Sequence, residues 1–443
     1  MSNNENNEIR DSFTSKTGFI LACIGSAVGM GNIWLFPYRV GQFGGAAFLI
    51  PYIIFIVLLG YTGLMGEFAF GRMTQTGPIG SFKKALETKN KHWGGFLGII
   101  PVVGAFGIAV GYAVVVGWFL RFLGGFITGS AMSAADSGAY FGELASHFGS
   151  IIWHLLALIL VSIVLISGIS KGIETMNKIM MPAFYILFVI VMVRVFMLDG
   201  AFEGIKYLVV PKWSSLMEPK TWIYALGQAF FSLSLAGSGM IVYGSYLKRD
   251  VDIMSSAKNT VIFDTLGAFL AGLVIIPAVF AFNLDPASGP PLLFITIPSV
   301  FKLMPFGRLF GVIFFISVLF ASITSLMNLL EVPIEAVQST FKLNRKLSVF
   351  IVVGAAFIFG LFAEDGNNLG VLMDFVSIYI IPIGAFIAAV MFFWVIGIEK
   401  AKSEIECGTD KKLGKLFEIS AKYVSVFLTI FVFIAGILLG GIG

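Results

Sequence analysis

Eleven long apolar segments constrain the fold of this chain more than any other feature. They cover residues 16–40, 43–71, 96–125, 150–168, 176–198, 221–247, 258–283, 308–338, 346–363, 369–397 and 418–440. A helix needs ~20 apolar residues to cross the hydrocarbon layer of a bilayer, and these segments meet or approach that length. Of 443 residues, 58% are hydrophobic and 12% are charged, whereas soluble domains carry roughly a quarter charged residues. The sequence therefore predicts an all-α integral membrane protein of about eleven transmembrane helices.

The basic residues of the loops predict the orientation of these helices. Lysines and arginines follow the second, sixth, eighth and tenth segments, whereas the loops at 129–147 and 362–369 contain none. Cytoplasmic loops are enriched in these residues, so we expect a cytoplasmic N-terminus and an extracytoplasmic C-terminus at Gly443, in the cell inner (plasma) membrane. The loop at 199–220, which carries three lysines, is an exception. A net charge of only +4, carried by loops between apolar runs, does not indicate nucleic-acid binding.

Two segments that lie five helices apart carry clusters of Gly and Ser at mid-length. The first is Gly25-Ser-Ala-Val-Gly-Met-Gly-Asn32, and the second is Ser232-Leu-Ser-Leu-Ala-Gly-Ser-Gly239. Gly weakens a helix interior, and backbone freed from helical bonds inside a membrane has to be buried or to line a cavity. Paired breaks in corresponding halves are typical of a transporter binding site, although Gly-x-x-x-Gly, as at Gly25 and Gly29, is also typical of close helix packing.

The pairing of these breaks predicts a 5+5 inverted repeat in which helices 1 and 6 are unwound at mid-membrane. The expected order is a cytoplasmic N-terminal segment (1–15), a first five-helix repeat (16–198), an extracellular loop (199–220), a second five-helix repeat (221–397), a cytoplasmic linker (398–417) and an eleventh helix (418–443).

Polar side chains inside the predicted helices offer oxygen ligands for sodium, a hard cation. They are Asn32 after the first break, Ser232 and Ser234 at the second, Asp264 in the seventh segment, and Thr324 and Ser325 in the eighth. A charged carboxylate in a spanning helix costs ~2.5–3.5 kcal/mol or more, so Asp264 indicates a functional site. Thr324 and Ser325 are weaker signals, because Ser and Thr in membranes commonly bond to their own helix.

An amino acid suits the same two breaks. Its carboxylate would accept hydrogen bonds from N–H groups at the helix N-terminus near Met30 and Gly31. Its ammonium would donate to carbonyls at the ends of the half-helices. Tyr112, deep in the third segment, is a candidate donor to the carboxylate, with a role as an interfacial anchor as the alternative. Three further acids, Glu67, Glu331 and Asp374, lie nearer to segment ends, where a structural role and a gating role are both open.

Four motifs carry a resemblance to a known family. They are Gly-Ser-Ala-Val-Gly-Met-Gly-Asn-Ile-Trp-Leu-Phe-Pro-Tyr at 25–38, Gln-Ala-Phe-Phe-Ser-Leu-Ser-Leu at 228–235, Ala-Ser-Ile-Thr-Ser at 321–325 and Glu-Val-Pro at 331–333. Together they resemble the helix 1, helix 6 and helix 8 signatures of the neurotransmitter:sodium symporters. The count of eleven helices is similar to that of the shorter bacterial amino-acid/sodium symporters of this family.

The resemblance implies two sodium ions and one substrate pocket. One ion would be bound by the Ala27 carbonyl, Asn32, Ser232, Asp264 and the substrate carboxylate, and the other by the carbonyls of Gly25, Val28 and Ala321 with the hydroxyls of Thr324 and Ser325. The pocket would comprise Ala27, Met30, Gly31, Tyr112, Phe231 as a lid, Ser232, Ser234 and Ser325, with Ile108, Gly237 and Leu329 around the substrate side chain. Many relatives have Asn where this chain has Asp264. Because the fixed charge of Asp264 replaces an added anion, chloride is not expected as a cofactor.

Both gates depart from the pairs that the resemblance implies. The outer gate has its acid in Asp374, but the position of its arginine is Leu35, with Arg39 as a candidate replacement. The inner gate retains Arg10, but the position of its acid reads Ser339. The remaining inner-gate candidates are Tyr246 and Glu331.

These features predict a sodium-coupled symporter that imports a neutral L-amino acid by alternating access across the lipid bilayer. Gly111 and Gly237 suggest space for a bulky hydrophobic or aromatic substrate, whereas Met30 and Leu329 are unable to pair with a charged one. The alternative is a membrane sensor or receptor that binds an amino acid without transporting it. An enzyme is not expected, because no nucleophile–base pair is evident. The sequence leaves a homodimer open.

Overall fold

The computed structural model describes residues 11–286 and 292–442 of the chain. Within these residues every regular element is helical, which confirms the predicted all-α class. The expected gate residue Arg10 and the predicted C-terminal end at Gly443 lie outside the described residues.

The first half of the bundle contains five helical segments. They are α1 (Lys16–Ala27) with η1 (Gly31–Leu35) and α2 (Phe36–Gln42); α3 (Ala46–Leu59) with η2 (Gly60–Leu64) and α4 (Met65–Thr74); α6 (Gly94–Thr128); α9 (Ile151–Ile166); and η3 (Ile169–Glu174) with α10 (Thr175–Phe196). The η elements are π-helical turns that continue the neighbouring helices.

The second half contains five further segments and a final helix. They are α13 (Pro219–Ser232) with α14 (Gly239–Ser245); α15 (Ile253–Ala281); α17 (Gly307–Phe341); α18 (Arg345–Phe362); α19 (Gly366–Phe375) with η5 (Val376–Ile380), α20 (Ile381–Val390), η6 (Met391–Gly397) and α21 (Ile398–Ile405); and α22 (Lys415–Ile419) with η7 (Ser420–Val424) and α23 (Ser425–Leu439). Shorter helices lie in the connections, namely α5 (Pro78–Glu87), α7 (Ser130–Ser133), α8 (Ser137–Leu144), α11 (Ala201–Val209), α12 (Trp213–Leu216) and α16 (Thr296–Leu303).

Eight helices of the described chain are long and apolar enough to cross a membrane. A ninth crossing is formed by α1 together with η1 and α2, which are bent by 51° relative to each other. The apolar helix α9 has 16 residues, and the α13–α14 pair is interrupted at Leu233–Ser238. With these two included, the arrangement is consistent with the eleven segments that the sequence predicts.

Side chains at the loop junctions determine where several of these helices begin. Ser15 accepts from the Gly18 N–H at 3.0 Å at the start of α1. Asp252 and Asn344 play the same part at the starts of α15 and α18. Each such N-cap contributes about 0.5–2 kcal/mol to its helix. The C-terminal end of the tenth segment differs from the prediction. This segment continues beyond the expected boundary at residue 397, because α21 extends it to Ile405.

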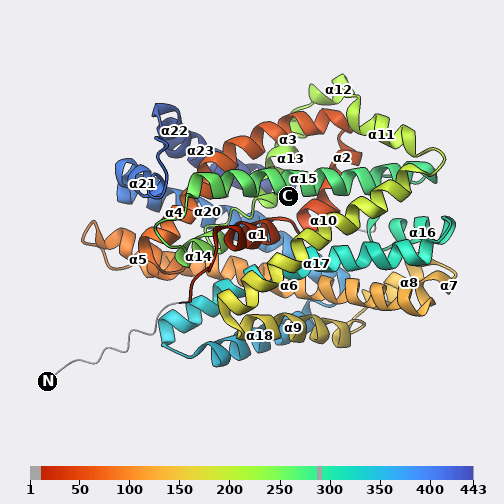
Figure 1. Ribbon diagram of the computed structural model, residues 1–443, viewed down its shortest axis with the longest axis horizontal. Helices are drawn as coiled ribbons and strands as arrows, with labels where there is room; N and C mark the ends of the chain where they lie inside the picture. Colours follow the sequence, from red (N-terminus) through yellow and green to blue (C-terminus); the bar gives the residue numbers. More distant parts are fainter. Residues whose placement is uncertain (1–10, 287–291, 443) are drawn as a thin grey trace.

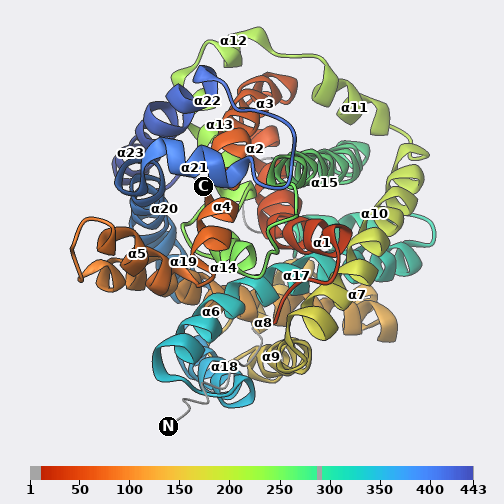
Figure 2. The ribbon, with the colours of Figure 1, turned by 60° about the vertical axis from the view of Figure 1, so that its left-hand side comes forward.

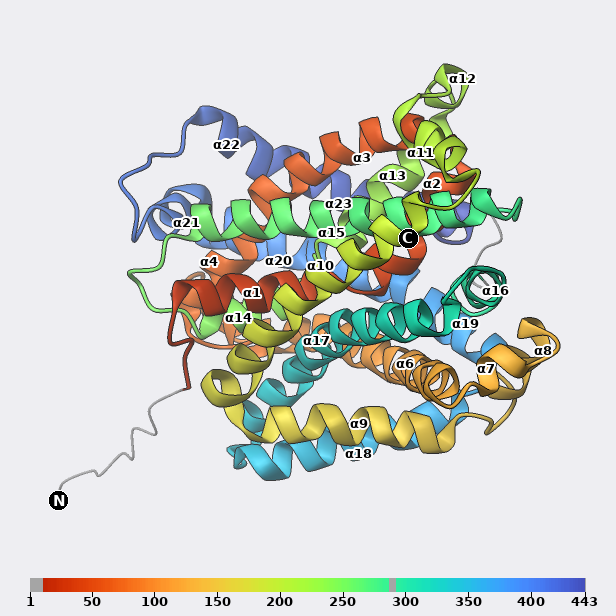
Figure 3. The same ribbon diagram turned by 45° about the vertical axis from the view of Figure 1, so that its right-hand side comes forward.

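The broken helix α1 lies inside the bundle rather than at its rim. Figure 2 looks nearly along the helices and shows α1 surrounded by α10, α14, α15 and α17. Figures 1 and 3 show that α5, α21 and α22 lie at one end of the molecule, and α7, α8 and α16 at the other. The lysine-rich connections after the second and tenth segments thus lie at the end opposite to the loop at 129–147, which has no basic residue, and the two breaks lie between these ends.

Candidate functional site

Two breaks place free helix ends in the middle of the bundle. The first helix ends at Ala27 and resumes after Val28 and Gly29. The second ends at Ser232 and resumes at Gly239. Helix ends leave N–H and C=O groups without intrahelical partners, with positive potential at the N-terminus and negative potential at the C-terminus. The centre of the protein therefore offers donors for an anion and acceptors for a cation.

A buried cluster of oxygen atoms joins the two breaks to α15. Asn32 Nδ2 donates to Asp264 Oδ1 at 2.8 Å and to Ser232 Oγ at 3.1 Å. Ser232 Oγ donates to Asp264 Oδ2 at 2.7 Å, and all three side chains are buried. The structure therefore brings together the three side chains that the sequence assigns to the first sodium site.

The Asp264 carboxylate has no basic partner in the part of the chain that the structure describes. A buried charge without a counter-ion is costly. A sodium ion would supply the missing charge, and rotation of the Asn32 amide would turn its oxygen toward that ion. Sequence reasoning missed Tyr52, whose buried hydroxyl lies 3.3 Å from Ser232 Oγ. The criterion that selected Tyr112, a tyrosine deep in an apolar segment, would also have selected Tyr52.

A second oxygen cluster lies where α17 meets the end of α1. Ser325 Oγ lies 3.0 Å from the carbonyl oxygen of Gly25 and 3.3 Å from that of Val28. Thr324 Oγ1 lies 2.9 Å from the Ala321 carbonyl. These are the five groups expected at the second sodium site. The structure adds the Ser26 carbonyl, which lies 3.1 Å from Ser325 Oγ and which the sequence did not single out.

A cavity of about 630 Å³ adjoins both clusters. This volume falls in the range of small-molecule sites, roughly 300–1,000 Å³. Among the expected substrate residues, its lining includes Ala27, Met30, Gly31, Ile108, Tyr112, Phe231, Ser234, Ser325 and Leu329. The described lining also includes Asn328, which was not expected.

Ser232 and Gly237 do not line this cavity, in contrast to the expectation. Ser232 is not part of the cavity wall, and its hydroxyl donates to Asp264 instead. Gly237 has a φ of +66° and faces α20, where an added Cβ would overlap the Gly384 carbonyl and lie 2.9 Å from Ala388 Cβ. Gly111 likewise makes room for Met373 and Leu369 of α19. Neither glycine lines the cavity itself, so neither supports a bulky substrate directly.

The helix N-terminus that follows the first break offers donors for an anion. The Met30 N–H donates to the Tyr112 hydroxyl at 2.9 Å. An added Cβ on Gly29 would overlap that hydroxyl, so the close approach of Tyr112 requires glycine there. Around Gly31 no atom lies within 4 Å of an added Cβ. A carboxylate here would meet helix N–H groups and the Tyr112 hydroxyl.

The outer-gate candidates Arg39 and Asp374 both line the cavity but form no ion pair in the described structure. Arg39 instead lies over the Tyr224 ring, 4.3 Å from its centroid, and donates to Gln42 Oε1 at 3.0 Å. Asp374 is exposed. The cavity therefore extends from the two breaks to the end of the molecule where Asp374 lies.

The inner-gate candidate Glu331 accepts two hydrogen bonds from Arg345, at 2.7 and 3.0 Å. Tyr246 donates to the same carboxylate at 2.8 Å. Ser339, at the expected acid position, bonds only weakly to the Ala336 carbonyl of its own helix. Sequence reasoning missed Arg345 because it begins the next helix, and only the fold brings it to Glu331.

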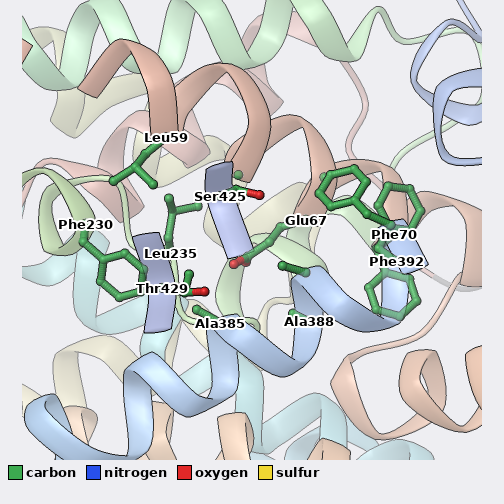
Figure 4. A pocket seen from close by; sticks show the side chains of 14 residues that line it. Leu59, Glu67, Phe70, Phe230, Leu235, Ala385, Ala388, Phe392, Ser425 and Thr429 are labelled. Atoms are coloured by element: carbon green, nitrogen blue, oxygen red, sulfur yellow. The ribbon is translucent and has the colours of Figure 1, made fainter. Parts of the chain in front are cut away.

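Glu67, on α4, is hydrogen-bonded to the backbone of the second break. Its Oε1 accepts from the Gly237 N–H at 2.8 Å, whereas Oε2 is buried and has no hydrogen-bond partner in the described part of the chain. Beside it lies a cavity of about 30 Å³ between α4, α13, α20 and α23, enough for about two water molecules. Figure 4 shows the Glu67 carboxylate in this cavity, with the hydroxyls of Ser425 and Thr429 on either side in that view. Of the two roles that the sequence left open, this contact favours a structural one.

Comparison with known proteins agrees with this geometry. Residues 10–133 and 140–439 match the model of the Sodium:neurotransmitter symporter family. An uncharacterized sodium-dependent transporter of Bacillus subtilis is 36% identical over 432 residues, or 94% of each chain. An uncharacterized sodium-dependent transporter of Methanocaldococcus jannaschii is 33% identical and covers 98% of this chain and 92% of its own. The crystal structure of MhsT in complex with L-phenylalanine superposes with a TM-score of 0.87 at 34% identity, covering 96% of this chain and 100% of that one.

Proposed function

The chain belongs to the sodium:neurotransmitter symporter family, a family of sodium-coupled membrane transporters and not of enzymes, and from this premise we propose that it imports a neutral, bulky hydrophobic or aromatic L-amino acid together with two sodium ions. The N-terminus would lie in the cytoplasm and the C-terminus outside the cell. The observation that carries the proposal is the buried contact of Asn32, Ser232 and Asp264 beside the ends of two broken helices.

The proposed first ion binds at this contact, and the amino acid completes its coordination. The ion would neutralise Asp264, and the substrate carboxylate would lie between the ion and the corner formed by Met30 and Tyr112. The substrate ammonium would donate to carbonyls at the ends of α1 and α13, where the helix dipoles favour a cation. An amino acid that lacks one of these two groups would leave one set of helix ends unpaired.

The proposed second ion binds at Thr324 and Ser325, between α17 and the end of α1. It has no contact with the substrate in this scheme and instead holds α1 against α17. Each of the two ions would gain about 2.3 kcal/mol per 100 mV of membrane potential. Together they would support uptake against a steep substrate gradient.

Support for a bulky, uncharged side chain comes from the cavity and from one relative. The cavity of about 630 Å³ is lined around the breaks by Ile108, Phe231 and Leu329, none of which pairs with a charge. MhsT was crystallised with L-phenylalanine. Chloride independence follows from Asp264, whose fixed charge would take the place of a bound anion.

The two ends of the cavity support an alternating-access cycle. In this structure the cytoplasmic side would be closed by Glu331, Arg345 and Tyr246, while the cavity reaches Arg39 and Asp374 on the other side. Binding of sodium and substrate would draw Arg39 and Asp374 together over the cavity. Opening of the Glu331 contacts would then release the cargo inward.

Uptake into proteoliposomes tests the proposal. Purified protein is reconstituted, an inward sodium gradient is imposed, and accumulation of each of the twenty amino acids is measured. We expect accumulation of large neutral amino acids that stops when the sodium gradient is collapsed. Binding without accumulation would favour the sensor alternative, and a failure of every amino acid to accumulate with sodium would contradict the proposal.

A further inference from the structure

Asn177 on α10 is a buried amide whose oxygen accepts no hydrogen bond from the residues that the structure describes. Its Nδ2 donates to the Ile173 carbonyl at 2.8 Å, one turn back along the helix. Its Oδ1 has no partner within residues 11–286 and 292–442, although the side chain is completely buried. Leaving a buried acceptor unsatisfied destabilises the folded protein. The position therefore needs an explanation outside the protein's own hydrogen bonds.

The unpaired oxygen points at the second oxygen cluster. A Cβ added to Gly25 would overlap Asn177 Oδ1, and would lie 2.8 Å from Thr324 Cβ and 3.1 Å from Thr324 Oγ1. Three elements, α1, α10 and α17, thus converge at Gly25, and the missing Cβ lets Asn177 Oδ1 and the Thr324 side chain approach the backbone there. Two of these residues, Gly25 and Thr324, are expected ligands of the second sodium ion.

Asn177 lies on the side of this cluster that faces the start of α10. The η3–α10 segment begins at Ile169, eight residues earlier, so Asn177 is about 12 Å along it at 1.5 Å per residue. Asp11, near the start of the described chain, caps that beginning through the Ile169 N–H. The same end of the molecule carries the lysine-rich connections. In the proposed orientation, Asn177 therefore lies on the cytoplasmic side of the second oxygen cluster.

We propose that Asn177 Oδ1 is an additional sodium ligand of the second site, on its cytoplasmic side. Oxygen is the donor that a hard cation prefers, and the ion supplies the partner that the amide lacks. The amide oxygen is neutral, so it can exchange with the oxygens of the cage without holding the ion as firmly as a carboxylate does. This inference rests on the proposed two-ion symport and adds one residue to it.

Sodium titration of substrate binding tests the inference in the full-length purified protein. Asn177→Ala removes the oxygen, and the half-saturating sodium concentration should rise about threefold to tenfold, as expected for the loss of one contact of hydrogen-bond strength. Asn177→Asp keeps an oxygen and adds a negative charge, so the half-saturating sodium concentration should fall. A purely structural role would not produce opposite shifts. If the alanine variant fails to fold, the aspartate variant decides alone.

Asn259→Ala is the matched control. Asn259 makes the same Nδ2 bond to the carbonyl one turn back, at 2.8 Å, but on α15. Its replacement should leave the sodium titration unchanged. If both Asn177 variants shift the titration in the same direction, or neither does, the inference is overturned.

Thr324→Val separates this inference from the proposed function. If the Thr324→Val protein keeps a normal sodium dependence, the proposed second sodium site is contradicted. If Thr324→Val weakens the sodium dependence while the Asn177 variants have unchanged titrations, the second site stands and Asn177 is not one of its ligands.

Discussion

The hydroxyl of Ser232 donates to Oδ2 of Asp264 at 2.7 Å and thereby ties the last turn of α13 to the middle of α15. Asn32 joins the same carboxylate from the other broken helix. One acid thus holds both breaks, although its own charge has no basic partner among the described residues. A cation bound here would compensate the charge of Asp264, which contacts both broken helices.

Replacement of Asp264 should expose the origin of the proposed chloride independence. In Asp264→Asn the fixed charge is lost while the shape is kept, so uptake should become strongly stimulated by chloride. In Asp264→Ala sodium-dependent uptake should be abolished. The measurement is uptake into proteoliposomes in chloride and in gluconate. Wild-type protein should be equally active in both salts, and a strict chloride requirement of the wild type would refute the assignment.

Tyr112→Phe should weaken binding of the amino acid through its carboxylate. A hydrogen bond to a charged group contributes about 1.5–3 kcal/mol, so the KM should rise by at least tenfold while the maximal rate changes less. Competition by an amine that has the same side chain but no carboxylate should be unaffected. Tyr140→Phe, on α8 in a loop, serves as the control. Equal losses for the amine and the amino acid would indicate a packing effect instead.

The Glu331–Arg345 pair should be strongly coupled. Removing one partner of a buried ion pair typically costs about 3–5 kcal/mol, and Glu331 is completely buried. Glu331→Gln and Arg345→Gln should each lower the thermal stability, and the double variant should be more stable than the sum of the single changes predicts. A double-mutant cycle by thermal unfolding measures this coupling. Additive effects would show that the two side chains are not energetically coupled.

Two glycines at the breaks should respond differently to alanine. Gly31→Ala meets open space, so the protein should fold normally but lose affinity for large amino acids relative to small ones. Gly237→Ala meets the Gly384 backbone and requires a φ of +66°, which costs a non-glycine residue about 1–3 kcal/mol. It should lower the melting temperature without a selective effect on large substrates. Melting curves and competition binding separate the two results. A selective loss of affinity for large amino acids in Gly237→Ala, with an unchanged melting temperature, would contradict the placement of Gly237.

Removal of sodium should destabilise the protein. A ligand at 100 times its Kd stabilises the folded state by about 2.7 kcal/mol, so replacement of sodium by choline should lower the melting temperature by several degrees. Potassium at the same ionic strength is the control for a general salt effect. An identical Tm in sodium, potassium and choline would argue against ion binding in the folded protein.

Helices and breaks were predictable from the sequence because each depends on local composition. Apolar length predicts the spans, and Gly clusters predict the positions at which α1 and α13 end. The oxygen donors Asn32, Asp264 and Thr324 were predictable for a related reason, since polar groups are rare inside spanning helices.

Contacts between distant segments were not predictable in this way. Arg345 reaches Glu331 only because α17 and α18 fold back on each other. Gly237 was misplaced because a sequence does not show toward which neighbour an unwound residue turns. Asn177 was overlooked because a lone amide near a helix start has no distinctive spacing, and its significance depends on Gly25 lying opposite.

The free helix ends also limit how the empty protein returns to its starting state. Carbonyls and N–H groups that bind cargo still need hydrogen bonds after the cargo has left, and an unmade bond is expensive in a low-dielectric interior. Only water can fill a cavity of about 630 Å³ at that stage. In the proposed cycle, water would therefore enter the cavity as the amino acid and its ions leave.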